Sequence, residues 1–121
     1  MHAFQPKRVV VTGVGVISSL ASSARETWQK LVAGETGIRR AANLNPDNHK
    51  CVLRADINDE DIPQRFLKGK ELRNASRYTR MAMEAAGEAM MDAGLLDDEL
   101  RPIQDVSAAG VAAGTCIGGT Y

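Results

Sequence analysis

Apolar residues near the start of the chain form a continuous run. Residues 8–17 read Arg-Val-Val-Val-Thr-Gly-Val-Gly-Val-Ile. An unbroken β-branched run is typical of a strand that is buried on both faces, and glycines permit a sharp turn or the close approach of another backbone. The pattern therefore predicts a strand over residues 8–16 in the middle of a sheet, with Gly13 and Gly15 at its exit.

A helical pattern follows this strand. Four apolar residues recur at helical spacing and form one stripe: Ala24, Trp28, Leu31 and Val32. Ser23 and Glu26 have the spacing of a capping box, and Gly34 can end the helix in the left-handed conformation. We therefore expect a helix here, with the Trp28 stripe packed in the core.

A longer helix is predicted over about residues 75–93. Its apolar positions are mostly alanine and methionine, Asn74 or Ser76 can cap its start, and Gly94 can end it. Alanines on such a helix allow a neighbouring element to pack closely. Three acidic residues are expected on the solvent side of this helix: Glu84, Glu88 and Asp92.

The remaining segments give weaker patterns. Apolar and polar residues alternate over residues 51–57, which predicts a half-exposed strand with Cys51 on its buried face. Residues 39–50 have the composition of an irregular loop, and residues 58–61 that of a solvated acidic turn. Residues 106–113 are small and apolar, and we expect a second central strand there.

Basic residues concentrate between residues 65 and 80. Six bases lie there against one acid, Glu71: Arg65, Lys68, Lys70, Arg73, Arg77 and Arg80. The side chains at 70, 73 and 77 are three and four positions apart, so one helical face would carry all three. Such a run is either a solvated face or a patch that docks an acidic partner.

Composition narrows the classes of protein. Lys plus Arg and Asp plus Glu both number 15, so no overall charge attracts nucleic acid or a membrane surface. No apolar run is long enough to span a bilayer, and the N-terminus has no signal-peptide pattern. Cys51 and Cys116 do not make a disulfide framework, and His49 has no second ligand at metal spacing. We expect a cytoplasmic protein with no metal and no cofactor.

The glycines after the first strand have one sharper interpretation. A glycine-rich turn between a strand and a helix can hold the pyrophosphate of a dinucleotide on the helix N-terminus. Gly13 and Gly15 have the required spacing, but Ser18 stands where the third glycine is needed, and no strand ends in an acid near residues 33–38. A small nucleotide-binding domain is therefore the weakest of the alternatives.

Four segments together point to a family. Residues 8–19 read R-V-V-V-T-G-V-G-V-I-S-S, and a Thr27-Trp28 helix ends in Ala33-Gly34. A second helix ends in Asp92-Ala-Gly-Leu95, and residues 114–119 read Gly-Thr-Cys-Ile-Gly-Gly, with Cys116 where glycine is usual. This combination resembles the β-ketoacyl-acyl carrier protein synthases, the elongating condensing enzymes of fatty-acid synthesis.

The resemblance implies an α/β protein, the incomplete N-terminal part of a thiolase-like αβαβα fold. Residues 1–121 would be the N-terminal segment of a ketosynthase domain, truncated before the catalytic cysteine and two histidines of the family, so no catalytic residue is assigned here. The intact enzyme is an acyltransferase and a homodimer that condenses acyl and malonyl groups held on acyl carrier protein. We expect this segment alone to be inactive.

The resemblance also suggests roles for three residues. Ile117 corresponds to the isoleucine that lines the acyl pocket near the dimer interface. Lys70 and Arg73 correspond to bases that meet the acidic acyl carrier protein, whereas Asn74 departs from a position where a further base is common. Cys116 is not expected to be the nucleophile, because no base is identifiable near it. A non-catalytic module that binds carrier protein or pairs with another ketosynthase remains the alternative.

Overall fold

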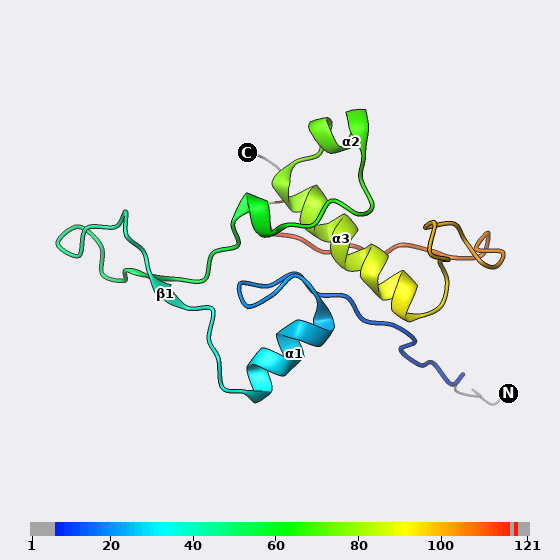
Figure 1. Cartoon of the computed structure of the whole chain (residues 1–121), viewed down its shortest axis with the longest axis horizontal. Helices are drawn as coiled ribbons and strands as arrows, with labels where there is room; N and C mark the ends of the chain where they lie inside the picture. The colour runs from blue at the N-terminus through cyan, green and yellow to red at the C-terminus, as the bar shows by residue number, and fades with distance from the viewer. Residues whose placement is uncertain (1–6, 117, 119–121) are drawn as a thin grey trace, which may run out of the picture.

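The computed structural model describes residues 7–116 and 118. Within them the chain forms three α-helices, one short 3₁₀ helix and one two-stranded sheet. In chain order these are α1 (Ala24–Val32), β1 (Arg39–Arg40), β2 (Leu53–Arg54), η1 (Asp59–Asp61), α2 (Gly69–Asn74) and α3 (Arg77–Asp92). Figure 1 shows α3 near the centre of the molecule, while the loop between β1 and β2 extends away from the helices.

Local capping signals place α1 and α3 where the sequence predicts them. The Ser23 hydroxyl accepts the N–H of Glu26 at 3.2 Å, and the Ser76 hydroxyl accepts the N–H of Thr79 at 3.2 Å. Both helices are followed by a glycine with positive φ, Gly34 at 76° and Gly94 at 67°. The two serine hydrogen bonds satisfy backbone N–H groups that have no partner within the first turn of a helix, and the glycines allow the chain to leave the last turn. Both helix predictions are confirmed.

The apolar stripe of α1 does not lie in a core. Trp28 is 67% exposed, and Leu31 and Val32 are exposed as well. The prediction that this stripe is packed inside is therefore wrong. Hydrogen bonds join α1 to other segments through Ala24, Thr27 and Lys30, and among the described residues nothing covers the side that carries Trp28.

The first valine run does not form a strand. No residue between 7 and 17 is paired in a sheet, and Val9 and Val11 are 88% and 84% exposed. The segment instead lies close against α3. A Cβ built on Gly13 would lie 2.1 Å from the carbonyl oxygen of Ala89, and one built on Gly15 would lie 1.9 Å from that of Ala85. The prediction of a central strand is wrong for the described residues, whereas the close backbone approach that the glycines allow is present.

The other two expected strands are also corrected. Only Leu53 and Arg54 of residues 51–57 are paired, antiparallel to β1, and Cys51 is exposed rather than buried. Residues 106–113 form no strand, and Val111 is 98% exposed. A strand needs a hydrogen-bonding neighbour, and no described segment pairs with this one. The layers of an αβαβα fold are therefore not seen in the described residues, which hold few helices and one small sheet.

The described part of the chain has a small buried interior. Ala41 and Ile62 are its buried apolar side chains, and Glu84 is buried at 2% exposure. The Phe66 ring lies against Gly87 of α3, where an added Cβ would come within 2.5 Å of ring carbons. None of the helices in this part of the chain is long and apolar enough to cross a membrane.

Candidate functional site

The short helix α2 presents a basic surface. Lys70 and Arg73 lie on it and are exposed, and Lys68 is its exposed N-cap residue. None of the three forms an ion pair with a carboxylate among residues 7–116. We call Lys68, Lys70 and Arg73 the α2 basic surface. It is the only part of the predicted patch whose positive charges have no ion pair in the described structure.

The predicted single helical face is interrupted. Helix α2 ends at Asn74, and Ala75 is extended, with φ −74° and ψ 128°. Arg77 therefore begins a new helix and does not continue the face of Lys70 and Arg73, so the prediction of one shared face is wrong. Figure 1 shows α2 set beyond the N-terminal end of α3.

The other three bases of the patch are held by carboxylates of the same chain. Arg65 pairs with Glu84 at 2.9 Å. Arg77 and Arg80 both pair with Asp59, at 2.7 Å and 2.8 Å. Asp59 belongs to the acidic turn that the sequence assigns only to solvent, so this contact is not foreseen. Asp59 is separated from Arg77 by 18 positions in the sequence and from Arg80 by 21 positions.

These arginines change the acidity of Asp59. The hydrogen bond from Arg80, followed by that from Arg77, holds the pKa of the Asp59 carboxyl below its ordinary value of 3.8. The pKa of Asp59 is lower in the folded protein than in the unfolded chain. The ionised carboxylate therefore stabilises the folded state fully when the pH is well above the ordinary pKa of 3.8. This stabilisation is lost as the pH falls through the folded pKa.

This linkage gives a testable pH dependence. The parent should be more stable to urea than Asp59→Asn at pH 7, and the difference should shrink toward zero as the pH falls through the lowered pKa of Asp59. Urea midpoints of both proteins between pH 2 and pH 7 measure it. A difference that stays constant over this range would show that the ion pairs with Asp59 do not form in solution.

Three carboxylates on one side of α3 accept backbone N–H groups from other segments of the chain. Glu84 accepts the N–H groups of Arg65 and Phe66 at 2.7 and 3.2 Å. Farther along, Glu88 accepts the N–H groups of Val16 and Ala24 at 2.9 and 2.8 Å, and Asp92 accepts that of Val14 at 3.0 Å. The prediction that these acids point to solvent is wrong for Glu84, which is buried. The sequence contained a signal: the three acids are four positions apart, so one side of the helix carries all of them.

Glu88 also bears on the nucleotide interpretation. Its carboxylate bonds the Ala24 N–H in the first turn of α1, and the Ser23 hydroxyl bonds that of Glu26. A negative side chain thus stands where a pyrophosphate would have to approach the helix. Gly13 and Gly15 lie against α3. The geometry gives no support to a dinucleotide site.

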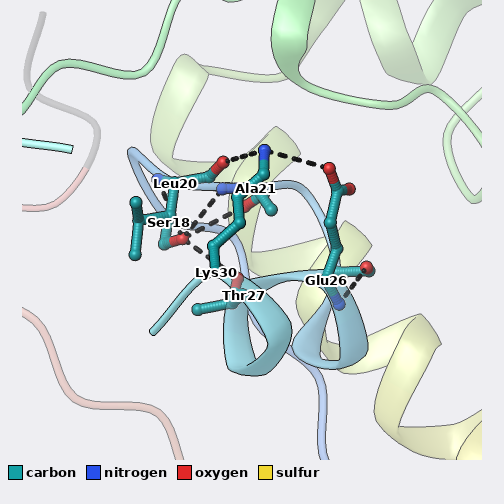
Figure 2. Close-up of polar contacts among 7 residues, drawn as sticks. Ser18, Leu20, Ala21, Glu26, Thr27 and Lys30 are labelled. Carbon is teal, nitrogen blue, oxygen red and sulfur yellow. Dashed lines mark hydrogen bonds and ion pairs between the residues drawn. The ribbon is translucent and has the colours of Figure 1, made fainter. Parts of the chain in front are cut away.

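A polar cleft lies beside the loop that precedes α1. It has a volume of ≈ 680 Å³ and runs from residues 18–22 to residues 56–63, with Lys30 and Arg39 on its wall. Figure 2 shows how this loop is fixed: the Ser18 hydroxyl accepts the N–H groups of Leu20 and Ala21, and the Lys30 ammonium donates to the Leu20 carbonyl at 2.8 Å while it pairs with Glu26. The wall carries charges of both signs and no nucleophile with a neighbouring base.

The other predicted residues contribute no site. Ile117, the acyl-pocket candidate, lies outside the described residues. Cys116 and His49 are both exposed. In the described structure no group of three His, Cys, Asp or Glu side chains could hold a metal ion.

Comparison with known proteins shows the family. The family model of the beta-ketoacyl synthase N-terminal domain matches residues 6–121. The chain belongs to the beta-ketoacyl synthase family. The resemblance found in the four sequence segments is thereby confirmed.

Individual relatives agree with this assignment. The chain is 33% identical over 115 residues to the 3-oxoacyl-[acyl-carrier-protein] synthase 2 of Coxiella burnetii, which covers 95% of this chain and 27% of that protein. It is 34% identical over 119 residues to the protein of the same name from Synechocystis, covering 98% of this chain and 27% of the relative. The chain therefore spans about a quarter of the length of the curated relatives it matches.

Proposed function

We propose that the chain is the N-terminal part of a 3-oxoacyl-acyl carrier protein synthase of fatty-acid synthesis, and that the α2 basic surface docks the carrier protein. The whole protein would be a cytoplasmic homodimer with a thiolase-like αβαβα fold and no cofactor. Its reaction would transfer the acyl group from the carrier-protein thioester to a cysteine thiolate, which releases the carrier protein's thiol. Loss of CO₂ from malonyl-carrier protein then gives the carbanion that attacks the acyl thioester and releases the thiolate. Ile117 would line the acyl pocket.

The observation that carries the docking proposal is the state of the six bases. Three of them form ion pairs with Glu84 or Asp59 of the same chain. The other three, Lys68, Lys70 and Arg73, are exposed and have no ion pair in the described structure. Glu71 is exposed on the same helix, so three bases face one acid, and such a local excess of positive charge attracts an acidic partner and orients its encounter. An acidic carrier protein fits this surface, and an acyl carrier protein is part of the name of the 3-oxoacyl-[acyl-carrier-protein] synthase 2 relatives.

Charge reversal on α2 tests the proposal. The double change Lys70→Glu and Arg73→Glu should slow association with purified bacterial acyl carrier protein by about three- to tenfold at low salt, because attraction becomes repulsion. The effect should shrink as salt screens the charges. The measurement is the stopped-flow association rate at two ionic strengths, with the variants made in the complete synthase.

The matched control reverses two exposed bases elsewhere. Arg25→Glu with Lys50→Glu changes the net charge equally but leaves α2 intact. If both double variants associate at the same reduced rate, only overall charge matters. If the α2 variant associates as fast as the parent, α2 is a solvated face and the docking proposal fails.

A non-catalytic carrier-protein-binding module is the second candidate. The exposed basic surface of α2 favours it equally, because docking a carrier protein needs no catalytic residue. The two candidates differ in covalent chemistry. Transfer of labelled acyl groups from carrier protein to the full chain supports the synthase, and binding without transfer supports the module.

A further inference from the structure

Asp59 forms ion pairs with two arginines, Arg77 and Arg80, that follow the proposed docking surface in the sequence. Arg77 begins α3 only four residues after Arg73, and its Nε donates to one Asp59 carboxylate oxygen at 2.7 Å. The Arg80 Nη2 group donates to the other oxygen at 2.8 Å. Both oxygens of one carboxylate are therefore taken by bases of the same patch.

We propose that Arg77 can bind the acidic carrier protein, but only when its ion pair with Asp59 is broken. Asp59 would therefore weaken the attraction between this surface and the carrier protein. This inference rests on the proposed docking function of α2. It assigns to the acidic turn η1 an autoinhibitory contact with the surface beside it.

The two arginines differ in how far a partner can reach them. The side chain of Arg80 is 19% exposed, and its Nε is buried without a hydrogen-bond partner in the described structure. Arg77 is 46% exposed and donates to the Ile57 carbonyl as well as to Asp59. Arg80 is thus enclosed by the protein, whereas Arg77 can turn toward a ligand once Asp59 releases it.

The contact with Asp59 is of a kind that an acidic partner can displace. Asp59 is 62% exposed, so its ion pairs lie in a well-solvated environment where the attraction is weak. A carboxylate or phosphate of the partner competes for the same guanidinium donors. Arginine suits such an exchange, because its planar fork binds either group through two parallel hydrogen bonds.

The test compares two adjacent substitutions that change net charge equally. Asp59→Asn removes the negative charge and one of the two acceptor oxygens that hold the arginines, while Glu60→Gln removes an exposed acid of η1 that forms no ion pair in the described structure. We expect Asp59→Asn to speed association with acyl carrier protein at low salt by about two- to fourfold, and Glu60→Gln to have a clearly smaller effect. Equal effects of the two substitutions would overturn the inference.

A second set of variants guards against loss of structure in Asp59→Asn. Arg77→Gln should leave the parent's association rate nearly unchanged, because this charge is already neutralised, but it should abolish the gain in the Asp59→Asn background. Equal slowing by Arg77→Gln in both backgrounds would also overturn the inference. The Lys70→Glu and Arg73→Glu variant separates the two proposals: if it slows association and Asp59→Asn behaves like Glu60→Gln, only the proposed role of Arg77 is wrong.

Discussion

Replacing Gly15 with alanine is expected to detach the N-terminal segment from α3 and to lower the free energy of unfolding by about 3 kcal/mol. The new Cβ would lie 1.9 Å from the Ala85 carbonyl oxygen and 2.8 Å from the Ala89 nitrogen. Both are backbone atoms of α3, so no flexible side chain can move aside. The segment must shift outward, which also weakens the bond from the Val16 N–H to Glu88.

Urea unfolding followed by circular dichroism measures this loss in the full chain. Gly110→Ala is the control, because a Cβ at that position meets nothing within 4 Å and its φ is not positive. Both substitutions add the same methyl group, so general effects of alanine on the unfolded chain cancel. An unchanged midpoint for Gly15→Ala would mean that the segment does not pack on α3 in solution.

The elements that the sequence predicts correctly are those specified by neighbouring residues. Ser23 and Ser76 each bond an N–H three residues later, and glycines end the helices within two residues of the last turn. Such signals need no information from distant parts of the chain. The limits of α1 and α3 follow from them directly.

The strands were not predictable in this way. The valines of residues 9–11 favour a strand, but a strand forms only if a second segment pairs with it, and pairing depends on residues far away in the sequence. In the described residues the carboxylates of α3 take that place: they accept the N–H groups of Val14 and Val16. A local pattern of apolar residues cannot distinguish between these two kinds of partner.

The proposed docking surface was predictable only in part for the same reason. The run of charge along residues 65–80 predicts that Lys70 and Arg73 are exposed, and they are, but it does not predict the separate short helix α2 that carries them. It does not reveal that Asp59 and Glu84 neutralise Arg65, Arg77 and Arg80, because these acids lie up to 21 residues away in the sequence. Net charge counted along a segment therefore overestimates the charge that a partner meets.

Glu84→Ala is expected to cause the other large loss, about 3–4 kcal/mol in the free energy of unfolding. One carboxylate oxygen accepts the N–H groups of Arg65 and Phe66, and the second accepts the Arg65 guanidinium at 2.9 Å. Removing the buried acceptor leaves two backbone donors without partners, at about 1–3 kcal/mol each. Phe66 is then released from its position against Gly87.

The conservative variant Glu84→Gln separates hydrogen bonding from charge. Its amide oxygen can still accept the backbone N–H groups, but its amide nitrogen cannot accept the Arg65 guanidinium, so we expect a loss of about 1–2 kcal/mol. Glu35→Ala is the control for removal of an exposed glutamate, and its unfolding midpoint should stay near the parent value. Urea unfolding of the three variants gives the order Glu84→Ala, Glu84→Gln, Glu35→Ala from least to most stable. If Glu84→Ala were no less stable than Glu35→Ala, the buried carboxylate would not be what holds the segment before α2 against α3.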